Sequence, residues 1–560
     1  MSAWRPIPGW LHVYIPLVRR QRARFISSSL LVVLSAAAEA FSLVVLGYAA
    51  TRSELEGTEA VLLSGLIGFS LAVSAGIRAG GEAAVALAQV DLERELRDDI
   101  SKAILRSDWQ DFVDQPGHEL QSAVLAESPQ VANATATCVR GFATGAAALV
   151  LFATAFFVSI YGALVCVLFA ILITRAYSYA SRGLGTVQKS LADGTTQITR
   201  HTAILVSGLR TLRLSPVQRE WANDLYAAYD RQATSRKHDL RIPIRGRFVV
   251  ELLGAVMIFG VLAVQTVASG NILPGLIVMA LILRVLPRIQ AAQQAWAIAK
   301  YGVIWVDRWN ARLSTIAQHP LQEGRPDPPL RRQSGAVLEF DNVEFRYRSH
   351  LTSAIRGLSL SISAGEWVGV VGPSGGGKST LIDLLGGILR PTQGQINLHD
   401  ISIHEIDPDI LHSTVAIVPQ DIHLMGETLE EMLTWGGRLE RPVNFDQICN
   451  SLGVTEMFLH STVGLASKMD ELGRDISGGM RTRLAVARAL MTSPEVLVLD
   501  ETTSRLHPTA EAAIFEDIRR TMPELAVMVV THREETTKEL DKVWRLESGL
   551  LRPSLKGGHP

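Results

Sequence analysis

The chain has 560 residues, which at ~150 residues per domain excludes a single small module. Hydrophobic residues make up 48% of it and charged residues only 19%, against ~25% charged in soluble domains, so membrane spans are expected. Lys and Arg number 54 and Asp and Glu 55, a balance that favours neither a nucleic-acid partner nor a disordered acidic chain. The three cysteines, Cys138, Cys166 and Cys449, are too few and too widely spaced for a disulfide framework or a zinc site.

The chain starts with MSAWRPIPGWLHVYIPLVRRQRARF, which has no short apolar core followed by a cleavage site and therefore does not resemble a removable signal peptide. Its aromatic and basic residues predict a helix lying at the cytoplasmic surface of a membrane.

Apolar runs crowd the first half and stop after about Arg312. They are Phe25–Ala50, Ala60–Ile77, Gly141–Thr174, Phe248–Ser269 and Ile272–Leu286. As one helix the third run would extend ~50 Å, well beyond a hydrocarbon core of ~30 Å. A turn near Ser159–Gly162 would divide it, so the sequence predicts about six transmembrane helices.

Basic residues mark one side of these spans. They precede span one (Arg19, Arg20, Arg22, Arg24), follow span four (Arg175, Arg182) and precede span five (Arg236, Lys237, Arg241, Arg245, Arg247). The loop after span one is acidic, with Glu54, Glu56 and Glu59. The positive-inside rule then predicts a multi-pass protein of the inner (cytoplasmic) membrane, surrounded by lipid, with both termini cytoplasmic.

Two long polar stretches between the spans, Gln89–Asn133 and Ser178–Asp239, have helical periodicity. We expect helices that continue beyond the bilayer and reverse at connectors near Asp108–Gly117 and Ser207–Pro216. Amphipathic loops packed on the membrane surface are the alternative.

A segment rich in Pro and charge separates two kinds of sequence. We expect a transmembrane domain at 1–318, a linker at 319–335 and a second domain at 336–560. In the second domain short β-like runs alternate with helical ones, which is typical of an α/β nucleotide-binding domain.

A glycine-rich loop follows the apolar strand WVGVV and precedes the helical LIDLLGGIL, the context that a phosphate-binding loop requires. Its residues are Gly372, Pro373, Ser374, Gly375, Gly376, Gly377, Lys378, Ser379 and Thr380. Glycines let backbone N–H groups surround phosphate oxygens, Lys378 supplies positive charge, and the Ser379 hydroxyl can ligate Mg²⁺.

The buried strand before Asp500 and Glu501 would place one carboxylate near Mg²⁺ and the other beside an attacking water. Solvated acids at a turn are the alternative. Between these motifs Ser477, Gly478 and Gly479 open a helix and predict a second anion-binding nest, with a simple helix cap as the alternative.

With these motifs the sequence resembles the ATP-binding cassette transporters. The likeness adds Tyr347 as the adenine-stacking aromatic, Gln420 as the Q-loop, Glu471 and Gly473 before the signature ISGGM, and His532 as the switch histidine. Taken alone, Tyr347 would be a core residue and His532 a buried structural histidine. The first half resembles the exporter-type membrane domain, and the segments at Glu251 and Arg284–Gln290 resemble flippases of lipid-linked oligosaccharides and small-peptide exporters.

The resemblance implies a membrane all-α domain followed by an α/β P-loop cassette that binds ATP. Glu501, His532 and Gln420 would be catalytic, and Ser379, Gln420 and Asp500 would hold Mg²⁺. Two half-transporters would close head to tail around ATP, with a homodimer favoured over a heterodimer. The implied activity is ATP-driven export or flipping of a lipid, peptide or other amphipathic substrate. The alternative is a membrane ATPase whose nucleotide cycle gates or regulates a partner.

The cassette departs from the family pattern at two places. Met480 stands where the family usually has glutamine, and Ser504-Arg505-Leu506-His507 ends in histidine instead of aspartate. Ionisable residues inside spans are costly and therefore candidates for function. Glu39 is expected to face the translocation cavity, whereas for Arg78, Glu82, Glu251 and Arg284 pairing between helices or snorkelling to the interface is favoured.

Overall fold

The computed structural model describes residues 9–51, 57–110, 117–158, 160–180, 184–269, 273–316, 336–348, 350–457 and 477–554. The chain forms two compact units. The first comprises Met1–Ser107 and Val113–His319, and the second comprises Asp108–Phe112 and Pro320–Pro560. The expected linker, residues 319–335, lies outside the described residues.

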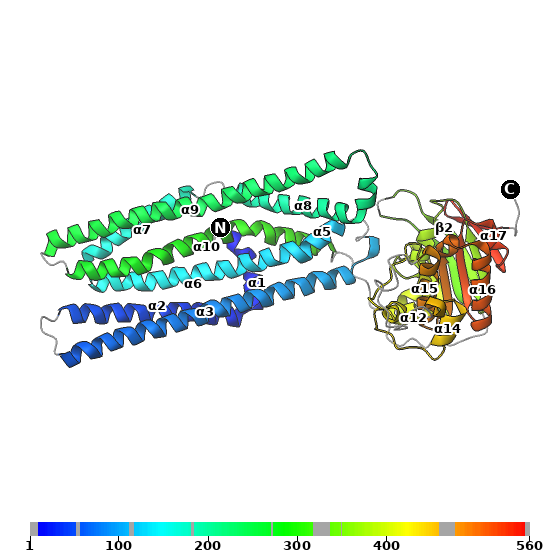
Figure 1. The fold of residues 1–560 in the computed structure, drawn as a ribbon, viewed down its shortest axis with the longest axis horizontal. Coiled ribbons are helices and arrows are strands. Elements are labelled where there is room, and N and C mark those ends of the chain that lie inside the picture. The colour runs from blue at the N-terminus through cyan, green and yellow to red at the C-terminus, as the bar shows by residue number, and fades with distance from the viewer. Residues whose placement is uncertain are drawn as a thin grey trace, which may run out of the picture. The chain divides into compact units, whose positions relative to one another are not determined.

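Helices make up the described part of the first unit (Figure 1). They are η1 (Gly9–Val13), α1 (Ile15–Arg20), α2 (Arg22–Thr51), α3 (Gly57–Leu105), α5 (Gly117–Ser122), η2 (Ala123–Glu127), α6 (Ser128–Val158), α7 (Ile160–Ala180), α8 (Leu184–Arg213), α9 (Gln218–Ser269) and α10 (Leu273–Ile316). Helix α2 packs along α3 and α6, α6 also packs along α10, and α7 and α8 pack mainly on α9.

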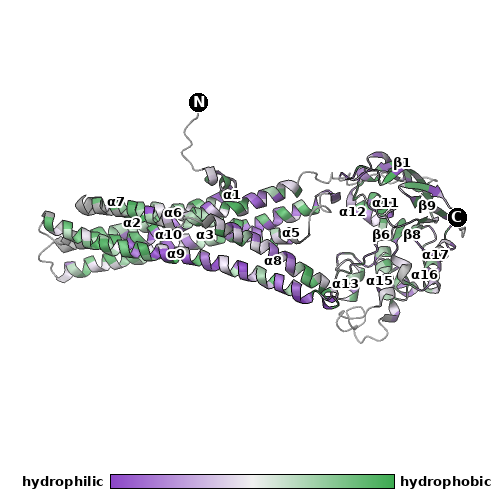
Figure 2. Cartoon of the chain, turned by 90° about the horizontal axis from the view of Figure 1, so that it is seen from above, coloured by the Kyte–Doolittle hydropathy of each residue, from purple (hydrophilic) through white to green (hydrophobic). Residues whose placement is uncertain are grey.

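Four stretches among the described residues are long and apolar enough to cross a membrane: Arg22–Leu46, Gly57–Leu105, Glu119–Thr154 and Ile244–Val264. The long third run is divided, because α6 ends at Val158 and α7 begins at Ile160. The other two expected spans fall in α7 and α10. Figure 2 shows the hydrophobic segments of these helices gathered toward one end of the bundle, which suits a bilayer.

Several helices extend well beyond the length that a bilayer needs. Helix α3 has 49 residues and α9 has 52, so at 1.5 Å per residue each exceeds ~70 Å. The first expected reversal falls between Leu105 and Gly117, partly outside the described residues. The second is shorter than expected: α8 remains helical to Arg213, and the chain turns only over residues 214–217, where Pro216 disfavours a continuing helix.

The second unit is built on two sheets. Its strands are β1 (Ala336–Phe345), β2 (Ile355–Ser363), β3 (Trp367–Val371), β4 (Gln393–Leu398), β5 (Ile401–Ser402), β6 (Val415–Val418), β7 (Val496–Asp500), β8 (Ala526–Thr531), β9 (Lys542–Glu547) and β10 (Leu550–Pro553). The antiparallel sheet has the order β2-β1-β4-β5, and the larger sheet has the order β10-β9-β3-β8-β7-β6 with parallel pairing from β9 to β6.

Short helices and turns connect these strands. They are α11 (Lys378–Leu385), η3 (Ile403–Glu405), α12 (Pro408–Thr414), α13 (Leu429–Leu433), α14 (Phe445–Ser451), η4 (Thr455–Met457), α15 (Gly478–Leu490), η6 (Thr502–Arg505), α16 (Pro508–Thr521) and α17 (Glu534–Thr537). Because parallel strands need crossover connections, helices cover both faces of the larger sheet.

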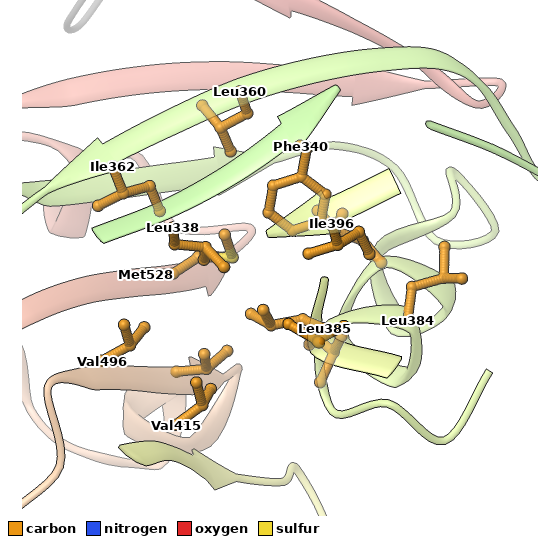
Figure 3. Close-up of a cluster of buried hydrophobic side chains, with 14 of the residues drawn as sticks. Leu338, Phe340, Leu360, Ile362, Leu384, Leu385, Ile396, Val415, Val496 and Met528 are labelled. Carbon is orange, nitrogen blue, oxygen red and sulfur yellow. The ribbon is translucent and has the colours of Figure 1, made fainter. Parts of the chain in front are cut away.

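Two apolar cores lie on the two faces of the larger sheet. One joins it to the antiparallel sheet and α11, as Figure 3 shows with Phe340, Leu385 and Met528. The other packs Trp367, Leu497 and neighbouring strand residues against α14, α15 and α16. Strands buried on both faces are rigid, so the loops at their carboxyl ends are held in fixed register.

Candidate nucleotide-binding and catalytic site

The candidate site lies at the carboxyl ends of four adjacent parallel strands. The phosphate loop follows β3, His532 follows β8, Asp500 and Glu501 end β7, and Gln420 comes two residues after β6. Val371 pairs with Thr531 and Asp500 with Val530, so these ends are level. Ligands of open α/β sheets bind in the crevice at this edge.

Close backbone packing explains the glycines of the phosphate loop. A Cβ at Gly372 would lie 2.1 Å from the carbonyl oxygen of Leu546, and one at Gly376 would lie 2.8 Å from the same atom. Gly377 has φ +107° and precedes Lys378, the first residue of α11. Any side chain at the first two positions would push the loop off β9, so only glycine fits.

Three polar side chains converge on Glu501. Lys378 Nζ lies 3.5 Å from Oε1, Gln420 Nε2 donates to Oε2 at 3.2 Å, and His532 Nδ1 lies 3.7 Å from Oε2. Lys378 is also held by the carbonyl oxygens of Gly372 and Pro373 at 2.8 and 3.2 Å. Glu501 sits at φ +48°, a costly conformation for a non-glycine residue and one found at functional sites.

Asp500 is the candidate metal ligand. Burial, with the adjacent Glu501 carboxylate adding to it, raises the pKa of Asp500 to about 6. Burial penalises the ionised form of Asp500, and a divalent cation would offset that penalty. The Ser379 hydroxyl and the Gln420 amide supply further oxygens of the kind that Mg²⁺ prefers. These donors therefore fit Mg²⁺.

Tyr347 lies beside the phosphate loop. Its hydroxyl is hydrogen-bonded to Thr380 Oγ1 at 3.1 Å, its ring is half-buried against Phe345, and burial raises the pKa of the phenol. Pro373 and Ser374 are exposed at the tip of the loop, and Ser379 is exposed one residue after Lys378. A planar ring next to a phosphate loop is suited to stacking on a base.

The second expected anion-binding nest, at Ser477, Gly478 and Gly479, lies at the start of helix α15. Ser477 caps α15 by accepting from the backbone N–H of Met480 at 3.2 Å, and a Cβ at Gly479 would lie 3.1 Å from Leu506. Among the described residues, the contacts of Ser477, Gly478 and Gly479 are with their own helix and with the segment after β7. Glu471 and Gly473 lie outside the described residues.

His507 precedes α16 at the position of the N-cap. Its Nδ1 is 2.9 Å from Thr509 Oγ1, and its side chain does not cap the helix. An aspartate there would accept from the free backbone N–H groups of the first turn, which imidazole does less well. Histidine at position 507 therefore leaves the first turn of α16 without the side-chain cap that aspartate would supply.

Two contributors to the site, Asp383 and Arg488, were not predicted from the sequence. Burial and the neighbouring Asp500 raise the pKa of Asp383, on α11, to about 6. Arg488 of α15 donates to the carbonyl of His423 at 2.7 Å and stacks over Trp435 at 4.3 Å, which ties α15 to the segment after Gln420. Spacing in the sequence carries no signal for either, because both roles depend on how separate strands and helices pack.

The expectation that Glu39 faces a cavity is wrong, because its side chain is buried between helices of the first unit. It is 3% exposed; Arg288 Nη2 donates to its Oε2 at 2.8 Å, and Arg78 Nη1 lies 3.4 Å from Oε1. A carboxylate deep in an apolar helix needs a partner, and here α10 and α3 supply two. Glu251 instead pairs with Arg247 on its own helix at 2.8 Å.

Comparison with known proteins agrees with this geometry. The ABC transporter family model matches residues 355–504. The chain is 30% identical to the glutathione/L-cysteine transport system ATP-binding/permease protein of Escherichia coli over 50% of this chain and 49% of that protein. It is 32% identical to the ATP-dependent lipid A-core flippase of Cupriavidus pinatubonensis over 40% of each. The matches thus span half or less of these relatives.

The fold agrees over almost the whole chain. A bacterial Atm1-family ABC exporter solved with ATP bound superposes with a TM-score of 0.73, covering 96% of this chain and 95% of that one at 18% identity. This is a multi-pass membrane protein with the fold of an ABC exporter, and its residues 355–504 form an ABC transporter ATP-binding domain.

Proposed function

We propose that the chain is one half of an ATP-driven exporter or flippase, which moves an amphipathic substrate across the inner (cytoplasmic) membrane from its cytoplasmic side. The observation that carries the proposal is the convergence of Lys378, Gln420 and His532 on Glu501 at one sheet edge. The exporter fold of the attached membrane unit supports it. Relatives named as a lipid A-core flippase and a glutathione/L-cysteine transport system support a role in membrane transport.

In this proposal the γ-phosphate of ATP takes the place of Glu501 beside Lys378. The ammonium group, which now lies 3.5 Å from the glutamate, would neutralise phosphate charge, while the loop N–H groups and Tyr347 hold the rest of the nucleotide. Released from Lys378, Glu501 can accept the proton of an attacking water, as a general base does. Gln420 and His532, already in contact with that carboxylate, would orient the water and the transferred phosphoryl group.

Magnesium would be held by Ser379, Gln420 and Asp500. When bound, it supplies positive charge to the phosphates and lowers the pKa of Asp500, which burial otherwise keeps high.

The site is completed by a second subunit in this proposal. Ser477, Gly478 and Gly479 form a nest at the start of α15 that makes no contact with its own phosphate loop among the described residues. Such a nest can bind the phosphates held by a partner. We favour a homodimer, in which hydrolysis lets the two cassettes separate and the membrane units alternate their access.

Vectorial transport tests the proposal. The purified protein is reconstituted into liposomes, ATP is added outside, and uptake of a panel of fluorescent amphipaths is measured. Molecules with outward-facing cassettes should accumulate at least one dye, and Glu501→Gln should abolish accumulation. Active hydrolysis with no movement of any dye would instead favour the alternative that nucleotide gates or regulates a partner.

A further inference from the structure

A large cleft opens in the first unit between α6, α7 and α10. It has a volume of about 1190 Å³, more than the ~300–1,000 Å³ of a usual small-molecule site. It exists because α6 packs along α10 whereas α7 packs mainly on α9, which leaves the facing sides of α7 and the α6–α10 pair apart. Its size suits a ligand as large as a lipid.

The two ends of the cleft differ in chemistry. Leu149, Phe152 and Val285 line one end, and Arg175, Gln293 and Lys300 line the other. Gln293 donates to Thr174 Oγ1 at 3.1 Å, and Lys300 lies 5.4 Å from the centre of the Tyr301 ring. No acidic residue is among the described residues that line the cleft, so no lining carboxylate neutralises Arg175 or Lys300. The polar end is therefore positively charged.

The charged end lies at the boundary of the bilayer. Gly141 starts the apolar run of α6 and packs against Ala295 of α10, and Trp296 stacks edge-on with Phe142 at 5.2 Å. Arg175 directly follows the apolar run of α7. Trp, Tyr, Lys and Arg gather at the level of lipid headgroups. From Gly141 to Phe152 the cleft then reaches about 16 Å into the hydrocarbon region.

We infer that this cleft binds an acidic membrane lipid, with its apolar tail between α6 and α7 and its phosphate headgroup between Arg175 and Lys300. The inference rests on the proposed function, for which it names the substrate class. Charge complementarity favours a phosphate, because two cations line the cleft without a carboxylate, and the apolar walls favour a phosphate that carries an acyl chain. Burial of the tail supplies affinity, and the cations supply selectivity over zwitterionic lipids.

Direct binding provides the first test, independent of hydrolysis. The full chain is placed in nanodiscs of phosphatidylcholine, and phosphatidic acid with brominated chains is added to quench tryptophan fluorescence. Trp296 lines the cleft, so the part of the quenching that is lost in Trp296→Phe measures lipid bound in the cleft. We expect Lys300→Gln and Arg175→Gln to raise the half-maximal concentration about tenfold or more, since charge-assisted hydrogen bonds contribute ~1.5–3 kcal/mol. Lys300→Arg should retain wild-type binding.

Lys189→Gln is the matched control, because this exposed lysine of α8 is not among the residues that line the cleft and the substitution removes the same charge. Equal quenching of wild type and Lys300→Gln, or equal binding of brominated diacylglycerol and phosphatidic acid, would overturn the inference.

Stimulation of ATP hydrolysis provides the second test. Phosphatidic acid should stimulate the wild type, and Lys300→Gln should keep basal turnover but need more lipid. Stimulation by glycerol 3-phosphate alone would assign the two cations to a soluble anion and overturn the lipid assignment. An enzyme that hydrolyses ATP through Glu501 but ignores the lipid would refute this inference alone, whereas a wild type without hydrolysis would refute the proposed function.

Discussion

Glu501 has two sets of partners in the proposed cycle. Its carboxylate faces Lys378, Gln420 and His532, so the lysine proposed to hold phosphate lies beside the residue proposed to activate water. Nucleotide binding then has to break a contact of 3.5 Å between Lys378 and Glu501.

Lys378→Ala should lower ATP affinity at least tenfold, because it removes a nearly buried ammonium that forms charge-assisted bonds. Binding of a fluorescent ATP analogue to the purified protein measures the effect. Lys542→Ala is the control, since this lysine of the same sheet pairs with Glu366 away from the phosphate loop. Wild-type affinity in Lys378→Ala would show that this loop does not hold the phosphates.

Asp383 predicts a pH effect on stability. Its pKa in the folded protein is raised from 3.8 to about 6, so between about pH 4 and pH 6 the folded state binds more protons than the unfolded state. Stability therefore falls as pH rises through this window. Asp383→Asn should raise the unfolding temperature of the nucleotide-free protein at pH 7.5 by about 2–4 °C, and by less at pH 5.

The control for this prediction is Asp446→Asn, which changes an exposed carboxylate of α14. Its difference from wild type should be the same at both pH values. An Asp383→Asn protein that is less stable than wild type at pH 7.5 would show that the carboxylate is paired and ionised in the folded state.

The roles of single residues were predictable where the spacing of a motif is required by one kind of chemistry. The order of glycines, lysine and hydroxyls from Gly372 to Thr380 predicts a phosphate loop, because few other chemistries need that spacing between a strand and a helix. Glu39 was not predictable in the same way. The sequence places a carboxylate mid-span but does not give the partners, since Arg288 is 249 positions away.

Glu39 joins three helices of the first unit. Its carboxylate on α2 contacts Arg288 on α10 and Arg78 on α3, and the side chains of Glu39 and Arg288 are 4% and 11% exposed. Removing one partner of a buried pair leaves the other charge uncompensated, which costs ~3–5 kcal/mol. The buried charges of Glu39 and Arg288 therefore each need the other for the fold to remain stable.

Glu39→Gln should thus lower the unfolding temperature and reduce basal and substrate-stimulated ATPase activity together. The double variant Glu39→Gln, Arg288→Gln should regain part of the lost stability, because it leaves no unpaired buried charge. Arg247→Gln, at an exposed pair within α9, is the control and should have little effect. Loss of substrate stimulation alone, with stability intact, would return Glu39 to the translocation pathway.

The bounds of helices were predictable where they depend on the length of an apolar run and on residues that interrupt a helix. The apolar runs predicted helices, four of which contain stretches long and apolar enough to cross a membrane, and the excess length of Gly141–Thr174 predicted the break that falls between α6 and α7. The extent of α8 was underestimated, because Ser207–Arg213 holds only one weak breaker, Gly208, and packing on α9 outweighs it. The cleft beside α7 was not predictable, because it depends on which helices pair.

At the scale of the whole molecule, the departures at Met480 and His507 bear on the dimer. In the proposed arrangement both would face the ATP held by the other subunit, while Lys378, Asp500 and Glu501 serve the chain's own ATP. A homodimer would then have two equally slow sites, and a heterodimer would have one impaired site. We expect the chain expressed alone to form an active dimer, as measured by its mass and its ATPase activity.

Restoring the family residues in Met480→Gln, His507→Asp should raise the turnover of that homodimer several-fold. Aspartate at position 507 would cap α16, which histidine does not do here, and so order the segment that faces the partner's nucleotide. Unchanged turnover would mean that both departures are neutral, and a monomer without activity would favour a heterodimer.

In the proposed mechanism Glu501 activates water at a site that binds ATP without it. Steady-state ATP hydrolysis by the full chain in nanodiscs, compared between wild type and Glu501→Gln, tests this most directly, with nucleotide binding measured on the same samples. We expect unchanged or tighter ATP binding and a 10²–10⁴-fold loss of turnover, the range of a general base. A Glu501→Gln protein that retains more than about a tenth of wild-type turnover, well outside that range, would contradict it.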